Sequence, residues 1–420
     1  MSIGLRMLGS LSQVQDLSRF DLGADLFLEG KEADAYGFVR SFATQYGTLP
    51  TEEALEDQGI TLPTTEEPAE YHYDKLRERF THRTMARTMT EASGLTTNKD
   101  YTGALSLLQA MCVDLSRAQN PNKILDFTMQ GLEHVMTAYK AAKMDGNSGI
   151  NLGWSTPDSM AGGLVGGDVA TIVGRPGAGK TYMMLFAALN AWLQGKVPLF
   201  VSMEMKPLPI MQRLTAMLTS LPISDLMAGE LPTALEHKMA NGLQEITGQQ
   251  PFWVIDGALS ATVDQIVLQT QQYKPDIVFI DAAYLLRHPN AKMSRWDRAT
   301  ENMELMKSIL AEDLDLPVVN SHQLNREAEK KIKKGKKDEL GVEDISYTDA
   351  VGQISSLVMA LLQEEKSNDV EIIDKREVTI MKGRNGESGA FDIRWNFNTG
   401  PNWLDFGEIE HVNLDDLGFE

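Results

Sequence analysis

The chain has 420 residues, of which 42% are hydrophobic and 23% charged, and this composition is typical of a globular enzyme. A formal net charge of −20 argues against the broad basic surface of a non-specific nucleic-acid coat, although it leaves room for a narrow basic channel. No window approaches the roughly 18 uninterrupted apolar residues of a membrane helix, and the start lacks a signal-peptide pattern. We therefore expect a cytoplasmic protein with no membrane partner, built from two domains and a connector.

Residues 1–118 are predicted to form a small, all-helical N-terminal domain. Apolar residues recur there at helical spacing, at Tyr36, Val39, Phe42 and Tyr46 and in the stretches 71–92 and 101–116.

The chain contains a single cysteine, Cys112, which excludes an internal disulfide framework and a multi-cysteine zinc site. Its neighbours Leu105, Leu108, Met111 and Leu115 recur at helical spacing. We therefore expect a buried thiol rather than a nucleophile.

Residues 119–150 are predicted to be a linker that contains one helix. Met129, Leu132, Met136 and Tyr139 form an apolar stripe along it. An isolated helix needs a surface on which to bury such a stripe. Packing within its own chain and docking on a neighbouring subunit are both open.

From residue 151 to 408 strands alternate with helices, a pattern that predicts an α/β domain with a mostly parallel sheet flanked by helices. The expected strands are 169–173, 199–203, 252–255, 277–280, 317–320, 356–362 and 378–381. Residues 409–420 are an acidic C-terminal tail, which either frays or is gripped by a partner.

The segment GRPGAGKT, residues 174–181, matches the phosphate-loop pattern, with an apolar strand before it and a helical run after it. Its glycines let backbone N–H groups close around phosphate oxygens, and the helix adds its positive end. Lys180 is expected to reach the β- and γ-phosphates and Thr181 to ligate Mg²⁺. The predicted nucleotide-binding residues are Gly174, Arg175, Pro176, Gly177, Ala178, Gly179, Lys180 and Thr181.

Polar residues follow three of the other predicted strands. Asp281 supplies the carboxylate that such a metal site needs in addition to the Thr181 hydroxyl. Glu204 is placed to orient or activate water against the γ-phosphate. Gln323 can sense that phosphate through its amide, and the adjacent His322 can do so instead, because spacing alone does not choose between them.

Two fixed positive charges, Lys382 and Arg384, stand in MKGRNGESG, between a β-branched run and a turn. They predict either phosphate recognition or a solvated strand edge.

The order of these segments resembles the DnaB-type replicative helicases of bacteria and phages, which carry RecA-like motors. The segments that carry the resemblance, colinear from about residue 153 to 406, are GRPGAGKT, SMEMKP, IVFIDAAYLL, VVNSHQLNR and KGRNGESG.

The resemblance implies a ring whose active sites lie between the RecA-like domains of adjacent subunits. It implies that Lys382 and Arg384 reach the neighbour's nucleotide, that Glu204 is the catalytic glutamate, and that Gln323 senses the γ-phosphate. An arginine supplied across an interface neutralises charge in the transition state only when the ring is assembled.

The chain departs from the family pattern in two places. Ala282, Ala283 and Tyr284 stand where bacterial members carry a tyrosine, a leucine and a glutamine, and His322 directly precedes the glutamine. Neither change removes an expected phosphate or metal ligand.

Single-stranded DNA is expected to contact loops, and residues 287–296 and 326–352 fall where the family places them. The second loop contains a lysine run that is either a solvated surface or, repeated around a ring, a source of positive potential for a phosphate backbone. The predicted DNA-binding residues are Lys333, Lys334, Lys336, Lys337, Thr348, Asp349, Ala350, Val351 and Gly352.

The resulting hypothesis is an ATP-driven, Mg²⁺-dependent homohexameric helicase that moves 5′ to 3′ on single-stranded DNA. A primase, polymerase or loader would be a separate partner, an arrangement more similar to a phage replisome helicase than to a bacterial one. A RecA- or RadA-like recombinase, and a nucleotide-switched loader or scaffold that unwinds nothing, are the alternatives.

Overall fold

The computed structural model describes residues 2–14, 28, 30–46, 48–119, 135–137, 139–140, 143, 149–257, 260–290, 292–334, 340–346, 349–362, 375–384, 386–395 and 406–409. The chain separates into two compact units, Met1–His134 and Val135–Glu420, and each unit has its own hydrophobic core. Among the described residues, none of the helices has both the length and the apolar character needed to cross a bilayer.

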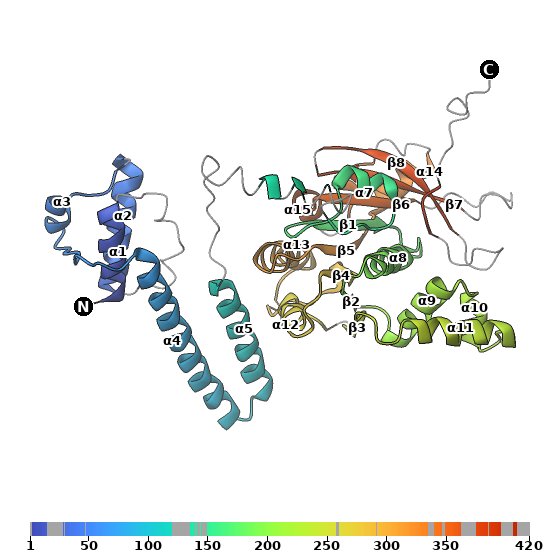
Figure 1. Ribbon diagram of the computed structural model, residues 1–420, viewed down its shortest axis with the longest axis horizontal. Coiled ribbons are helices and arrows are strands. Elements are labelled where there is room, and N and C mark those ends of the chain that lie inside the picture. Colours follow the sequence, from blue (N-terminus) through green and yellow to red (C-terminus); the bar gives the residue numbers. More distant parts are fainter. Residues whose placement is uncertain are drawn as a thin grey trace, which may run out of the picture. The chain divides into compact units, whose positions relative to one another are not determined.

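The first unit is helical, as predicted. Asp100 ends the turn between two long helices, where its carboxylate accepts a hydrogen bond from the Gly103 N–H at 2.9 Å. Leu8, Val39 and Leu76 are fully buried in the core of the unit. The helices are α1 (Ile3–Val14), α2 (Lys31–Tyr46), α3 (Glu52–Glu56), α4 (Ala69–Thr97) and α5 (Tyr101–Gln119) (Figure 1).

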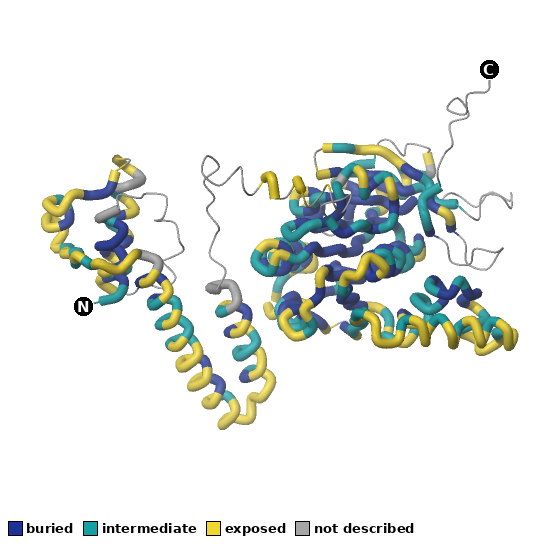
Figure 2. Tube along the Cα trace, in the orientation of Figure 1, coloured by how far each residue is buried: buried dark blue, intermediate teal, exposed yellow. Residues whose placement is uncertain are grey.

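The prediction that the Cys112 thiol is buried was wrong, because the residue is exposed. α5 packs on α4 and buries Ala104 and Met111, whereas Leu105 is 58% exposed. A helix that packs on one neighbour buries only one stripe of its surface, so the other faces of α5 meet solvent. Figure 2 shows this alternation of buried and exposed residues along α4 and α5.

In the described part of the second unit, eight strands form one sheet in the order β3-β2-β4-β5-β1-β6-β7-β8. The first six strands are parallel, and β7 is antiparallel to β6 and β8. The predicted mostly parallel sheet is confirmed. The strands are β1 (Val169–Gly174), β2 (Pro198–Ser202), β3 (Trp253–Asp256), β4 (Ile277–Asp281), β5 (Val318–Gln323), β6 (Leu357–Leu362), β7 (Lys375–Lys382) and β8 (Gly389–Arg394).

Strand β8 was not predicted from the sequence. This strand lies at the edge of the sheet and buries only Phe391 and Ile393, so it lacks the continuous apolar run of the central strands. Its antiparallel pairing with β7 makes a hairpin, and Arg384 and the left-handed Gly386 (φ +87°) lie in the connecting turn.

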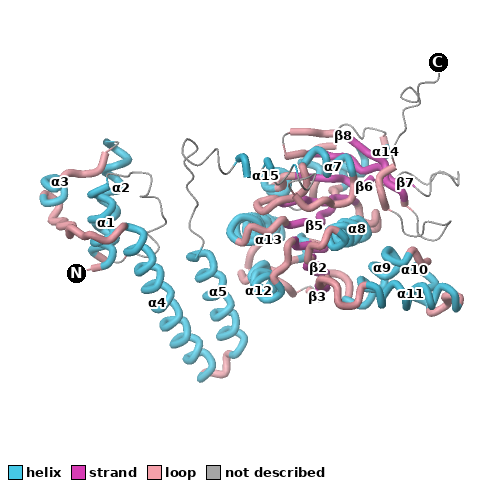
Figure 3. The backbone as a smooth tube through the Cα atoms, in the orientation of Figure 1, coloured by secondary structure: helices cyan, strands magenta, loops and turns pink. Residues whose placement is uncertain are grey.

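Helices cover both faces of the sheet, with α8 on one face and α12 and α13 on the other (Figures 1 and 3). The Ser294 hydroxyl caps α13 by accepting the Asp297 N–H at 3.1 Å. The remaining helical segments are α7 (Ser155–Ala161), α8 (Lys180–Leu193), α9 (Pro207–Thr219), α10 (Ile223–Ala228), α11 (Thr233–Glu245), α12 (Val263–Tyr273), η3 (Ala283–Leu285), α13 (Arg295–Leu305), the π-helix η4 (Met306–Asp313), α14 (Arg326–Lys333), η6 (Val342–Asp344) and α15 (Ala350–Ile354).

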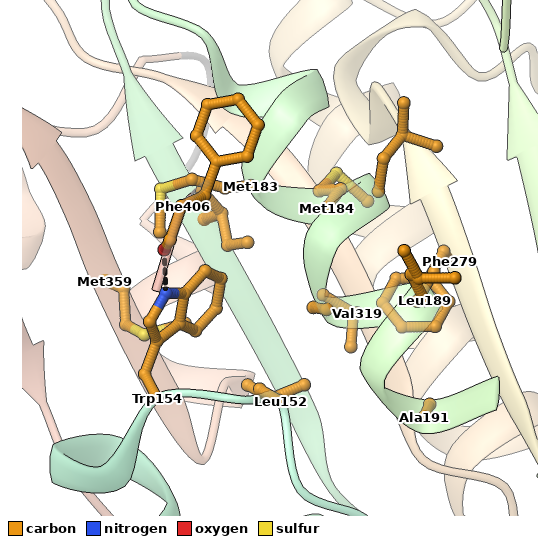
Figure 4. Close-up of a cluster of buried hydrophobic side chains, with 14 of the residues drawn as sticks. Leu152, Trp154, Met183, Met184, Leu189, Ala191, Phe279, Val319, Met359 and Phe406 are labelled. Carbon is orange, nitrogen blue, oxygen red and sulfur yellow. Dashed lines mark hydrogen bonds between the residues drawn. The ribbon is translucent and has the colours of Figure 1, made fainter. Parts of the chain in front are cut away.

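The core on the α8 side joins residues from both ends of the second unit. The Trp154 indole N–H donates to the Phe406 carbonyl oxygen at 2.8 Å, next to Met183 of α8 and Met359 of β6 (Figure 4). Pairing that indole N–H inside the core avoids the cost of burying an unsatisfied donor. The packing fixes α8, and therefore the loop that precedes it, against the sheet.

Candidate nucleotide site at the carboxyl ends of the central strands

The predicted phosphate loop joins the end of β1 to the start of α8. The six residues of β1 are all buried, so the strand is anchored at the centre of the sheet. Gly177 and Gly179 adopt φ values of +78° and +105°, which favour glycine. A Cβ atom on Gly179 would also lie 2.2 Å from the Trp395 ring. The loop therefore needs glycine at position 179 for two independent reasons.

Lys180 is the first residue of α8, and its side chain turns back over the loop. Its ammonium group lies 3.1 Å from the Gly174 carbonyl oxygen and 3.3 Å from that of Arg175. Burial lowers the pKa of Lys180, while the nearby carboxylates of Asp281 and Glu204 raise it. An ammonium held in this position fits the predicted contact with phosphate oxygens.

Asp281 ends β4 and accepts a hydrogen bond on each carboxylate oxygen. The Thr181 hydroxyl donates to Oδ2 and the Ser321 hydroxyl to Oδ1, both at 2.7 Å. Burial raises the pKa of Asp281, and these two hydrogen bonds lower it. A carboxylate and a hydroxyl in contact are an oxygen donor set that fits Mg²⁺. Ser321 was not predicted, and its only sequence signal was its place two residues before Gln323.

Glu204 and Gln323 are brought together by a third residue, Tyr284. The Tyr284 hydroxyl donates to Glu204 Oε1 at 2.9 Å and accepts from Gln323 Nε2 at 2.5 Å. In the sequence, Tyr284 stands out only as a departure from the family pattern. The structure thus groups the predicted water-activating carboxylate and the predicted γ-phosphate sensor, and it adds a hydroxyl between them.

The structure also separates Gln323 from His322. Side chains alternate along a strand, so Ser321 and Gln323 share the face of Asp281 while His322 points to the opposite face. His322 is 1% exposed, and burial lowers its pKa to about 3. Neither ring nitrogen of His322 has a hydrogen-bond partner among the described residues. Gln323 is therefore the better placed candidate for contact with a γ-phosphate.

Arg175 within the loop faces the segment that follows β5. Its guanidinium donates to the Leu324 carbonyl oxygen at 2.9 Å and pairs with Glu329 of α14 at 2.9 Å. Pro176 and Gly177 are exposed and Ala178 is buried. These contacts connect the phosphate loop to the start of the predicted DNA-binding loop.

Lys382 and Arg384 lie on the β7–β8 hairpin and contact other parts of their own chain. The Lys382 ammonium donates to the Gly352 carbonyl oxygen at 2.7 Å. The Arg384 guanidinium donates to the Gly163 carbonyl oxygen at 3.3 Å and forms an ion pair with Asp168. Neither cation bonds a described residue of the phosphate-loop cluster. Their predicted role towards a neighbour's nucleotide stays a prediction.

The predicted DNA-binding residues are described only in part. The Lys333 side chain, Lys336, Lys337 and Thr348 lie outside the described residues, whereas Lys334 and Asp349 are exposed. Residues 350–352, in α15, are buried, so any nucleic-acid contact there would use backbone groups. These assignments also stay predictions.

The second unit is similar in sequence to a known protein family. A family model described as the DnaB-like helicase C terminal domain matches residues 149–400, which include the phosphate loop, Asp281, Glu204, Gln323 and both hairpin cations.

Two curated relatives indicate how far the similarity extends. The replicative DNA helicase DnaB of Treponema pallidum (strain Nichols) is 27% identical over 251 residues, 59% of this chain and 54% of the relative. The replicative DNA helicase DnaB of Buchnera aphidicola subsp. Baizongia pistaciae (strain Bp) is 24% identical over 288 residues, 67% of this chain and 60% of the relative. The chain thus spans between half and two thirds of the length of these relatives.

A solved structure extends the likeness of fold. A DnaB-like replicative helicase, described together with its interactions with primase, superposes on 97% of this chain and 99% of its own with a TM-score of 0.60. Its sequence identity is 20%, so this match speaks for the fold alone.

Proposed function

The chain belongs to the DnaB-like helicase family, and from that premise we propose that it is a cytoplasmic, ATP-driven replicative DNA helicase. It would act as a homohexameric ring that moves 5′ to 3′ on single-stranded DNA and unwinds the duplex. The observation that carries the proposal is the family match over residues 149–400. The convergence of Lys180, Asp281, Glu204 and Gln323 at the carboxyl ends of adjacent parallel strands supports it.

The proposed reaction is hydrolysis of the terminal phosphoanhydride bond of ATP. A water oxygen bonds to the γ-phosphorus while the bond from that phosphorus to the bridging oxygen of ADP breaks. The Glu204 carboxylate takes the proton that the water loses and passes it to solvent. Lys180 and the N–H groups of the loop hold the phosphates, and the Gln323 amide contacts the γ-phosphate.

Thr181 and Asp281 are the proposed ligands of Mg²⁺, which when bound neutralises charge on the β- and γ-phosphate oxygens. The 2.7 Å contact between the Thr181 hydroxyl and the Asp281 carboxylate supports this assignment. Ser321 holds the other oxygen of Asp281 and thereby sets the direction of the carboxylate.

We further propose that Lys382 and Arg384 complete the site of the adjacent subunit. The absence of a bond from either cation to the phosphate-loop cluster of its own described chain supports a role in another copy. Charge supplied in this way would make hydrolysis depend on ring assembly.

The proposed architecture has an N-terminal domain at residues 1–118, a linker at 119–150, a motor at 151–408 and an acidic tail at 409–420. In the linker, Val135 and Tyr139 are 58% and 59% exposed, which supports docking of its helix on an adjacent subunit. Most of the linker, and all of the tail except its first residue, lie outside the described residues.

The proposed partners are single-stranded DNA and a separate primase, polymerase or loader. The related helicase whose structure was described with its primase interactions supports the primase. The lysine run supports phosphate-backbone contact without sequence preference.

Unwinding of a tailed duplex tests this function. The wild-type chain should open a duplex that carries a 5′ single-stranded tail and leave a 3′-tailed duplex intact, with ATP and Mg²⁺ present. Lys180→Ala should reduce ATP turnover by about 10³-fold, because the charged group that holds the phosphates is removed. DNA-stimulated ATP turnover without unwinding of either substrate would contradict the helicase assignment. Filaments on DNA with strand exchange would favour a recombinase instead.

A further inference from the structure

We propose that Tyr284 is a positioning residue that joins Glu204 to Gln323, so that the carboxylate which activates water is held in place by the γ-phosphate sensor. The inference rests on the proposed function and deepens it. The observation behind it is the pair of hydrogen bonds that meet at one phenolic oxygen.

The hydroxyl of Tyr284 has the chemistry that a bridge between these two groups requires. A phenol has one O–H donor and can also accept, so it can donate to a carboxylate and accept from an amide at the same time. Glu204 accepts at 2.9 Å and the Gln323 amide nitrogen donates at 2.5 Å. Burial, and then the Glu204 carboxylate, raise the pKa of Tyr284, so the donor keeps its proton at neutral pH. Tyr284 therefore orients Glu204 without exchanging the reacting proton.

The backbone around Tyr284 is held firmly enough for this task. The residue is the centre of the short helix η3, whose N–H groups at Leu285 and Leu286 donate to the carbonyl oxygens of Ala282 and Ala283 at 3.1 Å. Leu286 is fully buried, and Tyr284 itself is 7% exposed. A rigid, packed ring fixes the position of its hydroxyl better than a flexible surface side chain would.

Glu204 has less support from its own segment than Tyr284 has. It is an exposed residue two positions beyond the end of β2, although the preceding Met203 is buried and its N–H donates to the Asp281 carbonyl oxygen at 2.6 Å. The backbone of this turn is therefore already joined to the end of β4, and the bond to Tyr284 fixes the direction of the Glu204 carboxylate. A displacement of about 1 Å in a reacting group can cost about 10²-fold in rate, so a tether at this place has a large effect on turnover.

Gln323 also connects the bridge to the segment that leads to the predicted DNA contact. Its carbonyl oxygen accepts the Ser346 N–H at 2.7 Å, and Leu324 forms a β-bridge with Ile345. A shift of that segment on DNA would move Gln323, and Tyr284 would transmit the shift to Glu204. This continuous chain of bonds gives a physical route by which DNA stimulates hydrolysis, and coupling measurements can test it.

Tyr284→Phe keeps the ring and removes both hydrogen bonds. We expect DNA-stimulated kcat to fall by about 10- to 100-fold, while KM for ATP and the affinity for a fluorescent ATP analogue change by less than about twofold. The matched control is Tyr273→Phe, which removes a hydroxyl from α12 of the same unit and should leave both parameters unchanged. Circular dichroism and sedimentation check that fold and assembly are retained.

Tyr284→Gln is the rescue variant, because an amide has both a donor for Glu204 and an acceptor for Gln323. It should restore kcat to within about threefold of wild type. In a double-mutant cycle, Tyr284→Phe should cost little when Gln323→Ala is already present, because the two residues act as one unit.

Three results would overturn the inference. They are a Tyr284→Phe variant as active as Tyr273→Phe, a loss confined to KM and nucleotide affinity, and additive effects of Tyr284→Phe and Gln323→Ala. Each of these can occur in an active helicase and then leaves the proposed function intact. A wild-type chain with no DNA-stimulated ATP turnover would overturn the proposed function, and this inference with it.

Discussion

The carboxyl ends of β1, β2, β4 and β5 differ from the β7–β8 hairpin in what their charged side chains contact. At the strand ends, Thr181 and Ser321 both donate to Asp281, and Tyr284 joins Glu204 to Gln323. On the hairpin, the cations bond a backbone carbonyl and a carboxylate elsewhere in the chain. One region therefore completes its network within a single chain, whereas the other holds positive charge apart from it. Among the described residues, the two hairpin cations thus make no bond to the strand-end cluster of their own chain.

The largest effect that can break this comparison is expected from Arg384. Arg384→Ala should lower DNA-stimulated ATP turnover by about 10³-fold, the usual loss when an arginine that neutralises transition-state charge is removed. Glu204→Gln should lower it by about 10²- to 10⁴-fold, because the proposed general base is lost. Mixing the two variants in equal amounts should restore activity, because about one interface in four then receives an intact Glu204 and an intact Arg384. Steady-state ATPase assays across mixing ratios measure the rescue.

The control for the mixing experiment is Glu204→Gln mixed with Lys180→Ala, which should show no rescue because both defects lie on the phosphate-loop side of the interface. Activity that stays at the level of the separate variants at every ratio would mean that Arg384 serves its own chain. The comparison between the two regions would then lose its functional meaning.

A smaller effect is expected on stability, and it sharpens the comparison at the strand ends. There the burial of His322 should make the free energy of unfolding depend on pH. Burial lowers the pKa of His322 to about 3 from an ordinary value of 6.5. As pH falls below 6.5 the unfolded chain takes up a proton that the folded chain does not, so the free energy of unfolding falls. The loss should reach about 2 kcal/mol near pH 5 and continue towards the folded pKa.

His322→Leu should remove that part of the pH dependence between neutral pH and about pH 5. All six tryptophans lie in the second unit, so urea unfolding followed by tryptophan fluorescence reports the unit that contains His322. The exposed His237→Leu variant of α11 is the control and should keep the wild-type slope. Equal slopes for His322→Leu and the wild type would mean that His322 titrates normally in the folded chain.

The smallest expected effect concerns the lysine run that follows β5. Lys330 and Lys331 pair with Glu327 and Asp344 at 2.6 Å and 2.7 Å, so their charges are engaged within the chain. Replacing Lys336 and Lys337 by glutamine should make the salt dependence of single-stranded DNA binding less steep, by about 0.7 for each phosphate that a lysine no longer neutralises.

The matched control replaces Lys330 and Lys331 by glutamine and should leave the slope of log Kobs against log salt unchanged. Fluorescence anisotropy of a labelled oligonucleotide over a range of salt concentrations measures both slopes. A slope that is unaltered by replacement of Lys336 and Lys337 would mean that these charges only solvate a loop.

The sequence by itself determined the parts of this protein that depend on local pattern. Continuous apolar runs identify the buried parallel strands, and the glycines before Lys180 identify the phosphate loop, because few residues tolerate its backbone. The grouping of the residues that end those strands could also be predicted, since the carboxyl ends of parallel strands meet at one edge of the sheet. The edge strand β8 and the exposure of Cys112 could not be predicted from the sequence, because both depend on how many neighbours an element has.

Only the tertiary structure decided which side chains meet within that edge. Ser321 and Tyr284 gave no distinctive signal, because a serine in a strand and a tyrosine in a turn are common in any protein. Their roles arise from contacts across 40 and 80 residues of sequence, to Asp281 and Glu204. The preference for Gln323 over His322 as the proposed γ-phosphate sensor likewise rests on strand alternation in the folded sheet. Hydrogen bonds are short and directional, so they are set by the final packing of distant segments, which no local pattern contains.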